Sequence, residues 1–280
     1  MTQFTEIPLH YPTWMRKQPL LAFYTLAFSI SWLGWIPQAA HSRGLFPLDS
    51  PIFYVLGGVG PLLAVFIMLK VLQGKVDYGK VFHPLWQWHA GAIWYFVALF
   101  VYPAMWLATL FLSGDLKTEL AKLGPPLTVL STFLVAFLAA IPEQVAWRGF
   151  ALPRLQARYT ALISSLIVGV LWALWHFPLL LNTDNVMSTY PIFLWFLDVI
   201  ARSIIHTWIF NSTRGSLLFV TLFHAASNTA GSFVGVENLA VSVVVVAILI
   251  IVFRPAHLSL GKERSIQKDS PLAISNLELR

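Results

Sequence analysis

Three short polar clusters interrupt the apolar stretches in the second half of the sequence. Within each cluster, two side chains stand four positions apart, which places them on one face of a helix. The clusters are Glu143, Gln144 and Arg148; Trp172 and His176; His224 and Asn228. Ionisable groups are costly in hydrocarbon and usually serve a function there. We therefore expect the three clusters to face one buried polar site.

Four of these residues have the chemistry for hydrolysis. In a low-dielectric environment a carboxylate binds a proton more readily, so Glu143 could act as a general base toward a water. The neutral imidazoles of His176 and His224 could bind a divalent metal such as zinc or stabilise an oxyanion, to which the Asn228 amide could also donate. The sequence leaves open whether a metal is used. The structural alternative is that these groups only hydrogen-bond one another and hold helices together.

A further polar stripe lies outside these clusters. Asp198, Arg202 and His206 recur every fourth residue in an otherwise apolar stretch, so they share one helix face. One interpretation is an internal ion pair that faces the bundle. The other is that the stripe borders the site, with Arg202 binding a substrate carboxylate or Asp198 supplying a counter-charge to Arg148.

The composition is that of an integral membrane protein. Of 280 residues, 58% are hydrophobic and 11% are charged, whereas soluble domains carry about 25% charged residues. The absence of Cys excludes disulfides, thiolate metal ligands and a Cys nucleophile. The net charge of +6 comes from basic residues scattered between apolar runs, a pattern that sets membrane topology and does not indicate nucleic-acid binding.

Eight apolar segments are candidate membrane spans, for which about 20 residues are needed. They are residues 20–39, 52–72, 91–112, 127–149, 161–181, 192–210, 216–233 and 239–253. We expect an all-α membrane domain over residues 20–253, with about eight transmembrane helices in one bundle around a buried polar cavity. Lys and Arg collect in alternate connections, which places both termini, residues 1–19 and the polar tail 254–280, in the cytoplasm.

The three clusters resemble the motifs of the CPBP family, which comprises CAAX proteases and bacteriocin-processing or immunity proteins (Abi). That family carries Glu-Glu-x-x-x-Arg, then Phe-x-x-x-His, then His-x-x-x-Asn, and the resemblance covers roughly residues 127–233. It implies a multi-helix membrane fold and an intramembrane endopeptidase. It also implies that the active site consists of Glu143, His176, His224 and Asn228.

Two positions depart from the family pattern. Trp172 replaces the Phe, which keeps an apolar wall and changes the size of the pocket. Gln144 replaces the second Glu and leaves Arg148 without a counter-charge from that position. Because the first Glu, both His and the Asn are present, we expect activity to survive.

The sequence thus predicts an intramembrane endopeptidase that acts on a membrane-associated peptide or protein in the lipid bilayer. The neutral Gln144 keeps open a non-catalytic scaffold or immunity protein built on the same frame. A small-solute transporter that uses the Asp198 and Arg202 stripe is a third hypothesis. The chain has no His-Glu-x-x-His, Gly-x-Ser-x-Gly or Gly-x-Gly-Asp sequence, which argues against other intramembrane protease classes.

Overall fold

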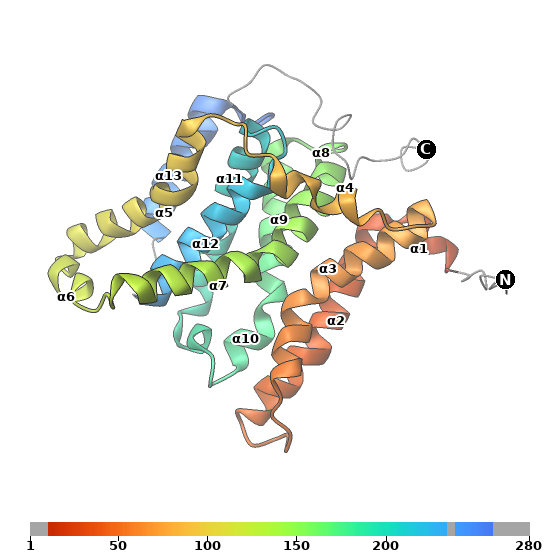
Figure 1. The fold of residues 1–280 in the computed structure, drawn as a ribbon, viewed down its shortest axis with the longest axis horizontal. Helices are drawn as coiled ribbons and strands as arrows, with labels where there is room; N and C mark the ends of the chain where they lie inside the picture. The colour runs from red at the N-terminus through yellow and green to blue at the C-terminus, as the bar shows by residue number, and fades with distance from the viewer. Residues whose placement is uncertain (1–10, 234–238, 260–280) are drawn as a thin grey trace.

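The computed structural model describes residues 11–233 and 239–259 of the chain, and none of these residues forms a strand (Figure 1). The long helices are α2 (Pro19–His41), α3 (Pro51–Gln73), α5 (Ala92–Ser113), α7 (Pro126–Gln144), α9 (Ala161–Trp175), α11 (Ile192–Ser212), α12 (Leu217–Phe233) and α13 (Leu239–Phe253). Short helical segments join them: α1 (Thr13–Lys17), α4 (Tyr78–Phe82), η1 (His83–Trp86), α6 (Leu116–Leu120), η2 (Val145–Ala151), α8 (Leu152–Gln156), α10 (Phe177–Leu181) and η3 (Val186–Thr189).

Six helical segments in the described part of the chain are long and apolar enough to cross a membrane. They are Pro19–His41, Pro51–Gln73, Ala92–Ser113, Pro126–Gln156, Ala161–Leu181 and Ile192–Ser212. The protein is therefore an integral, multi-pass membrane protein. The last two expected spans form helices of 17 and 15 residues, α12 and α13. At 1.5 Å per residue these rise by about 26 and 23 Å, short of a hydrocarbon core of about 30 Å.

Helices α2 and α3 form an antiparallel hairpin at one end of the bundle (Figure 1). Their close approach depends on glycine, because a Cβ atom at Gly57 would collide with the side chain of Trp35. The hairpin is attached to α9 by a hydrogen bond of 2.9 Å, in which Trp32 Nε1 donates to the carbonyl oxygen of Trp175. The hairpin therefore forms a wall beside α7 and α9.

Helix α7 crosses the bundle and packs against both α12 and α3 (Figure 1). Its helical path continues through the π-helical segment η2 into α8, so the expected fourth span is continuous. Pro142 lies inside α7 just before this change and lacks the backbone N–H that a regular helix uses. The segment Val145–Ala151 is entirely buried. The Glu143–Arg148 motif thus lies where α-helical geometry changes to π-helical geometry, a feature often found at functional sites.

Helix α11 is the most deeply buried of the six long segments, and α9, α12 and α13 pack around it. It lies close to α9, because a Cβ atom added at Gly169 would stand only 2.9 Å from Cβ of Ser203. A polar residue on α11 must therefore find its partners inside the protein.

The chain returns to the bundle after α13. The carbonyl oxygens of Pro255 and Ala256 accept hydrogen bonds of 3.0 Å from the backbone N–H groups of Leu162 and Ala161. These contacts satisfy donors in the first turn of α9 that have no partner within the helix. Residues 260–280 of the expected tail, and residues 1–10 of the N-terminal segment, lie outside the described residues.

Candidate active site

The buried side chain of Trp172 on α9 is the contact point of four helices. Its Nε1 donates a hydrogen bond of 2.6 Å to Oε2 of Glu143 at the end of α7. Its ring makes edge contacts with His206 on α11 and with His224 on α12, each with ring centroids 5.4 Å apart. Trp172, which replaces an aromatic residue of another type in the family motif, thus holds the carboxylate and touches two imidazoles.

Arg148 lies fully buried beneath this cluster. Its guanidinium carbon stands 4.5 Å from the centroid of the Trp172 ring, a cation–π arrangement. Its Nη2 donates a long hydrogen bond of 3.4 Å to Oγ of Ser203. Its Nε and Nη1 have no hydrogen-bond partner in the part of the chain that the structure describes. The positive charge is therefore held close to Glu143 by packing more than by directed bonds.

Gln144 contacts His224, one of the expected catalytic residues. Its Nε2 donates a hydrogen bond of 2.7 Å to Nδ1 of His224, and both side chains are buried. Because Nδ1 accepts this bond, the neutral imidazole carries its proton on Nε2. The residue that departs from the family motif thus couples α7 to α12 and fixes the tautomer of His224.

His176 lies at the C-terminal end of α9, at the edge of the cluster. Its Nδ1 donates a hydrogen bond of 2.8 Å to the carbonyl oxygen of Trp172, which leaves Nε2 as an acceptor. Its ring packs edge-on against Trp175 at 4.6 Å and Trp195 at 5.5 Å, and stacks on Trp35 at 6.1 Å between centroids. The side chain is half-buried, so this aromatic enclosure is open on one side.

Asn228 is the expected site residue that the structure does not bring into the cluster. It lies one turn beyond His224 on α12, but its side chain is exposed, whereas His224 is 3% exposed. Its backbone carbonyl accepts a hydrogen bond of 2.8 Å from Oγ of Ser232. Shared spacing therefore did not give these two residues the same environment.

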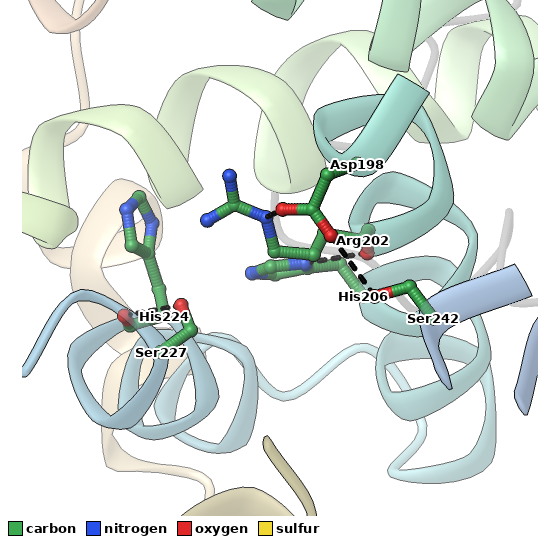
Figure 2. A network of polar contacts seen from close by, with 6 residues as sticks. All are labelled: Asp198, Arg202, His206, His224, Ser227 and Ser242. Carbon is green, nitrogen blue, oxygen red and sulfur yellow. Dashed lines mark hydrogen bonds and ion pairs between the residues drawn. The ribbon is translucent and has the colours of Figure 1, made fainter. Parts of the chain in front are cut away.

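The polar stripe on α11, Asp198, Arg202 and His206, contains an internal ion pair and also borders the cluster (Figure 2). Nε of Arg202 lies 2.8 Å from Oδ2 of Asp198, whose Oδ1 accepts a hydrogen bond of 2.9 Å from Oγ of Ser242 on α13. This is an internal ion pair, and Asp198 is paired with Arg202 and not with Arg148. Yet the stripe also borders the cluster, because His206 contacts Trp172 and the Arg202 guanidinium points toward His224.

Sequence patterns did not indicate several residues of this cluster. Oγ of Ser203 accepts from Arg148 and donates a hydrogen bond of 2.9 Å to the carbonyl oxygen of Ser165. Ser242 anchors Asp198 from a different helix. Serine is common in membrane helices as a small packing residue. Only the contact with a buried charge, which the sequence does not show, identifies these two serines as part of the cluster.

The described residues do not fit a metal centre. Among residues 11–233 and 239–259, no three His, Asp or Glu side chains are grouped so that they could hold a metal ion. His224 has Nδ1 occupied by Gln144, and Oε2 of Glu143 is engaged by Trp172. The arrangement instead offers a held carboxylate, a proton on His224 Nε2 and a nearby positive charge.

Comparison with known proteins supports the resemblance in the sequence. Residues 125–230 match a family model described as "Type II CAAX prenyl endopeptidase Rce1-like". A stretch of 99 residues is 36% identical to CAAX prenyl protease 2 of Methanococcus maripaludis. This match covers 32% of the chain and 36% of that relative's length. The motif residues Glu143 to Asn228 all lie within the matched region, and residues 125–230 therefore form a domain of the Rce1-like family of type II CAAX prenyl endopeptidases.

Proposed function

We propose that the protein is an intramembrane endopeptidase that hydrolyses a peptide bond of a membrane-associated protein or peptide. The observation that carries the proposal is the hydrogen bond between Trp172 Nε1 and Glu143 Oε2, beside an imidazole that carries its proton on Nε2. A carboxylate, an imidazole N–H and the Arg148 charge thus surround one buried tryptophan, and they support the roles of general base, oxyanion donor and stabilising charge. The family of the 125–230 domain supports the same reaction class.

In the proposed reaction, Glu143 takes a proton from a water, and the water oxygen attacks the carbonyl carbon of the peptide bond. The carbonyl oxygen becomes an oxyanion, to which His224 donates from Nε2–H while the Arg148 charge stabilises it. The carbon–nitrogen bond then breaks, and Glu143 passes its proton to the departing amine. Asn228 is exposed and His176 is half-buried, and we assign both of them contacts with the substrate chain.

The substrate class follows from the membrane setting and from the relative. Glu143 and His176 lie on segments that are long and apolar enough to cross a membrane, so we propose that a substrate reaches them from within or beside the bilayer. The relative from Methanococcus maripaludis carries the name CAAX prenyl protease 2. We therefore propose a protein tail that is anchored in the membrane, and a lipid-modified CAAX peptide is the first substrate to test.

The test is cleavage of a prenylated CAAX peptide, and of a library of membrane peptides, by the purified protein. We expect Glu143→Gln to lower the rate by at least about 100-fold, since it removes the general base. The matched control is Glu119→Gln, because Glu119 pairs with Lys122 on and beside the short helix α6. Full activity of Glu143→Gln would refute the assigned role, and so would equal losses in the two variants.

A chelator arm completes the experiment. The described residues bring no three ligands together, so we expect cleavage to be unchanged after treatment with a metal chelator. Loss of cleavage that zinc restores would show that the site rearranges to bind a metal.

A second candidate function is a non-catalytic membrane scaffold or immunity protein. Two observations favour it: Gln144 stands where the family motif has a carboxylate, and the side chain of Asn228 is exposed outside the cluster. Such a protein would bind a membrane peptide without cleaving it. Saturable peptide binding that is equal in wild type and Glu143→Gln, with no product from any peptide, would favour the scaffold.

A further inference from the structure

His206 is a buried residue of α11 to which the proposed reaction assigns no role. Its Nδ1 donates a hydrogen bond of 2.8 Å to the carbonyl oxygen of Arg202. The neutral ring therefore has its lone pair on Nε2. That atom is buried and has no hydrogen-bond partner among the described residues. A buried acceptor in this state usually has an ordered water or a function to explain it.

The surroundings of His206 contain one polar ring. Its neighbours are Phe223, Trp172 and His224, with ring centroids 4.8, 5.4 and 5.8 Å away. Figure 2 shows the ring edge that is not bonded to Arg202 pointing to the side on which His224 lies. The indole N–H of Trp172 is already given to a carboxylate, so it does not serve His206. Of these three rings, His224 is the one with an N–H left to donate.

The two imidazoles have complementary hydrogen-bonding roles. The bond from Gln144 leaves His224 with its proton on Nε2, a donor, and the bond to Arg202 leaves His206 with an acceptor on Nε2. Two nitrogens that share one water are about 4.7 Å apart, from two bonds of about 2.9 Å at a tetrahedral angle. The ring centroids of His206 and His224 are 5.8 Å apart, so their Nε2 atoms can lie about 4.7 Å from each other.

We propose that His206 is a positioning residue for His224: one water accepts from Nε2–H of His224 and donates to Nε2 of His206. The water holds the His224 ring in place, and when a substrate binds, its carbonyl oxygen takes the place of the water as the acceptor of the Nε2 proton, as the proposed function requires. The effect on catalysis thus rests on the proposed function, whereas the hydrogen-bond arrangement does not. The chain has 8 His residues, so each imidazole can be observed separately by ¹⁵N NMR.

The activity-independent test is ¹⁵N NMR of histidine-labelled protein, with signals assigned by single substitutions. We expect the proton on Nδ1 in His206 and on Nε2 in His224. His206→Phe should shift the His224 nitrogen signals, whereas His41→Phe should leave them in place, because His41 bonds Phe46 in the α2–α3 connection. Unshifted His224 signals in His206→Phe, or a proton on Nε2 of His206, would overturn the proposal.

The kinetic test compares two substitutions at the same position. We expect His206→Phe to lower kcat about 10-fold with KM nearly unchanged, as for loss of one net hydrogen bond. His206→Gln keeps an acceptor at similar reach and should recover most of kcat, which a purely structural role would not require. Wild-type kcat in His206→Phe would overturn the proposal. If the wild type cleaves no peptide, the proposed function fails and the NMR result alone decides the role of His206.

Discussion

The side-chain amide of Gln144 and the imidazole of His224 are joined by a hydrogen bond of 2.7 Å, although 80 positions separate them in the chain. This bond differs in direction from the one that a carboxylate at position 144 would make. A carboxylate can only accept and would draw the proton of His224 to Nδ1, whereas the Gln144 amide donates and leaves that proton on Nε2. With an amide NH2 in place of a carboxylate oxygen as the partner of Nδ1, the proton of His224 thus lies on the opposite ring nitrogen, Nε2.

The first prediction concerns the stability that this bond provides. Gln144→Leu keeps the approximate volume and leaves Nδ1 of His224 buried without a partner, so we expect a loss of about 1–3 kcal/mol in the free energy of unfolding. Thermal unfolding in detergent measures it. Gln73→Leu, at the exposed end of α3, is the control and should change stability by less than about 0.5 kcal/mol. Equal stability of Gln144→Leu and the wild type would show that the bond contributes nothing.

The second prediction concerns the ion pair on α11. Asp198→Asn leaves the Arg202 charge inside the bundle without its carboxylate, and loss of one partner of a buried pair costs about 3–5 kcal/mol. The matched control is Asp77→Asn, because Asp77 pairs with Lys80 on the surface at 3.7 Å, where a pair is worth at most about 1 kcal/mol. We expect a clear fall in the unfolding temperature for Asp198→Asn alone. Similar small shifts in both variants would contradict the buried pair.

The local part of this arrangement could be predicted from the sequence, and the long-range part could not. Spacing by four predicts the pair of Asp198 and Arg202, because both residues lie on one regular helix. The same rule does not describe Gln144 and Arg148, whose segment becomes π-helical and changes the angle between successive residues. The partner of Gln144 lies on another helix, and only packing of α7 against α12 decides that contact.

The membrane spans show a similar limit. Apolar runs predicted the long helices within a few residues, since hydrophobicity and length determine a span. The seventh run, residues 216–233, also forms a helix within one residue of its predicted bounds, α12 of 17 residues. Asn228, one turn after His224, was expected on the same face and is exposed. Helical periodicity identifies a face, but the neighbouring helices determine how far along it the burial extends.

The third prediction concerns the packing of α2 on α3. Gly57→Ala adds a Cβ that collides with the Trp35 side chain, so the two helices must move apart. We expect a lower unfolding temperature and a loss of about 1–3 kcal/mol. Gly58→Ala is the control, because a Cβ there meets nothing within 4 Å and alanine favours the helix by up to about 1 kcal/mol. If Gly57→Ala is as stable as Gly58→Ala, the close approach of α2 and α3 is not required.

The last prediction concerns topology, for which the absence of Cys makes labelling direct. We propose eight spans, with α12 and α13 crossing as short helices and both termini in the cytoplasm. This follows from the alternation of basic connections. Single substitutions at exposed positions test it: Lys75→Cys and Arg214→Cys should react with a membrane-impermeant maleimide only from the cytoplasmic side, and Asp184→Cys and Ser232→Cys only from the opposite side.

The position that decides between the alternatives is Ser232, near the end of α12. If α12 crosses the membrane, Ser232→Cys and Arg214→Cys react from opposite sides, and His224 between them lies within the bilayer. If both react from the cytoplasmic side, α12 lies in the bundle without crossing, the six long segments are the spans, and a substrate would reach His224 from the cytoplasmic face. Labelling of Lys75→Cys from outside would instead invert the whole orientation, because basic connections would then lie on the side that the charge rule disfavours.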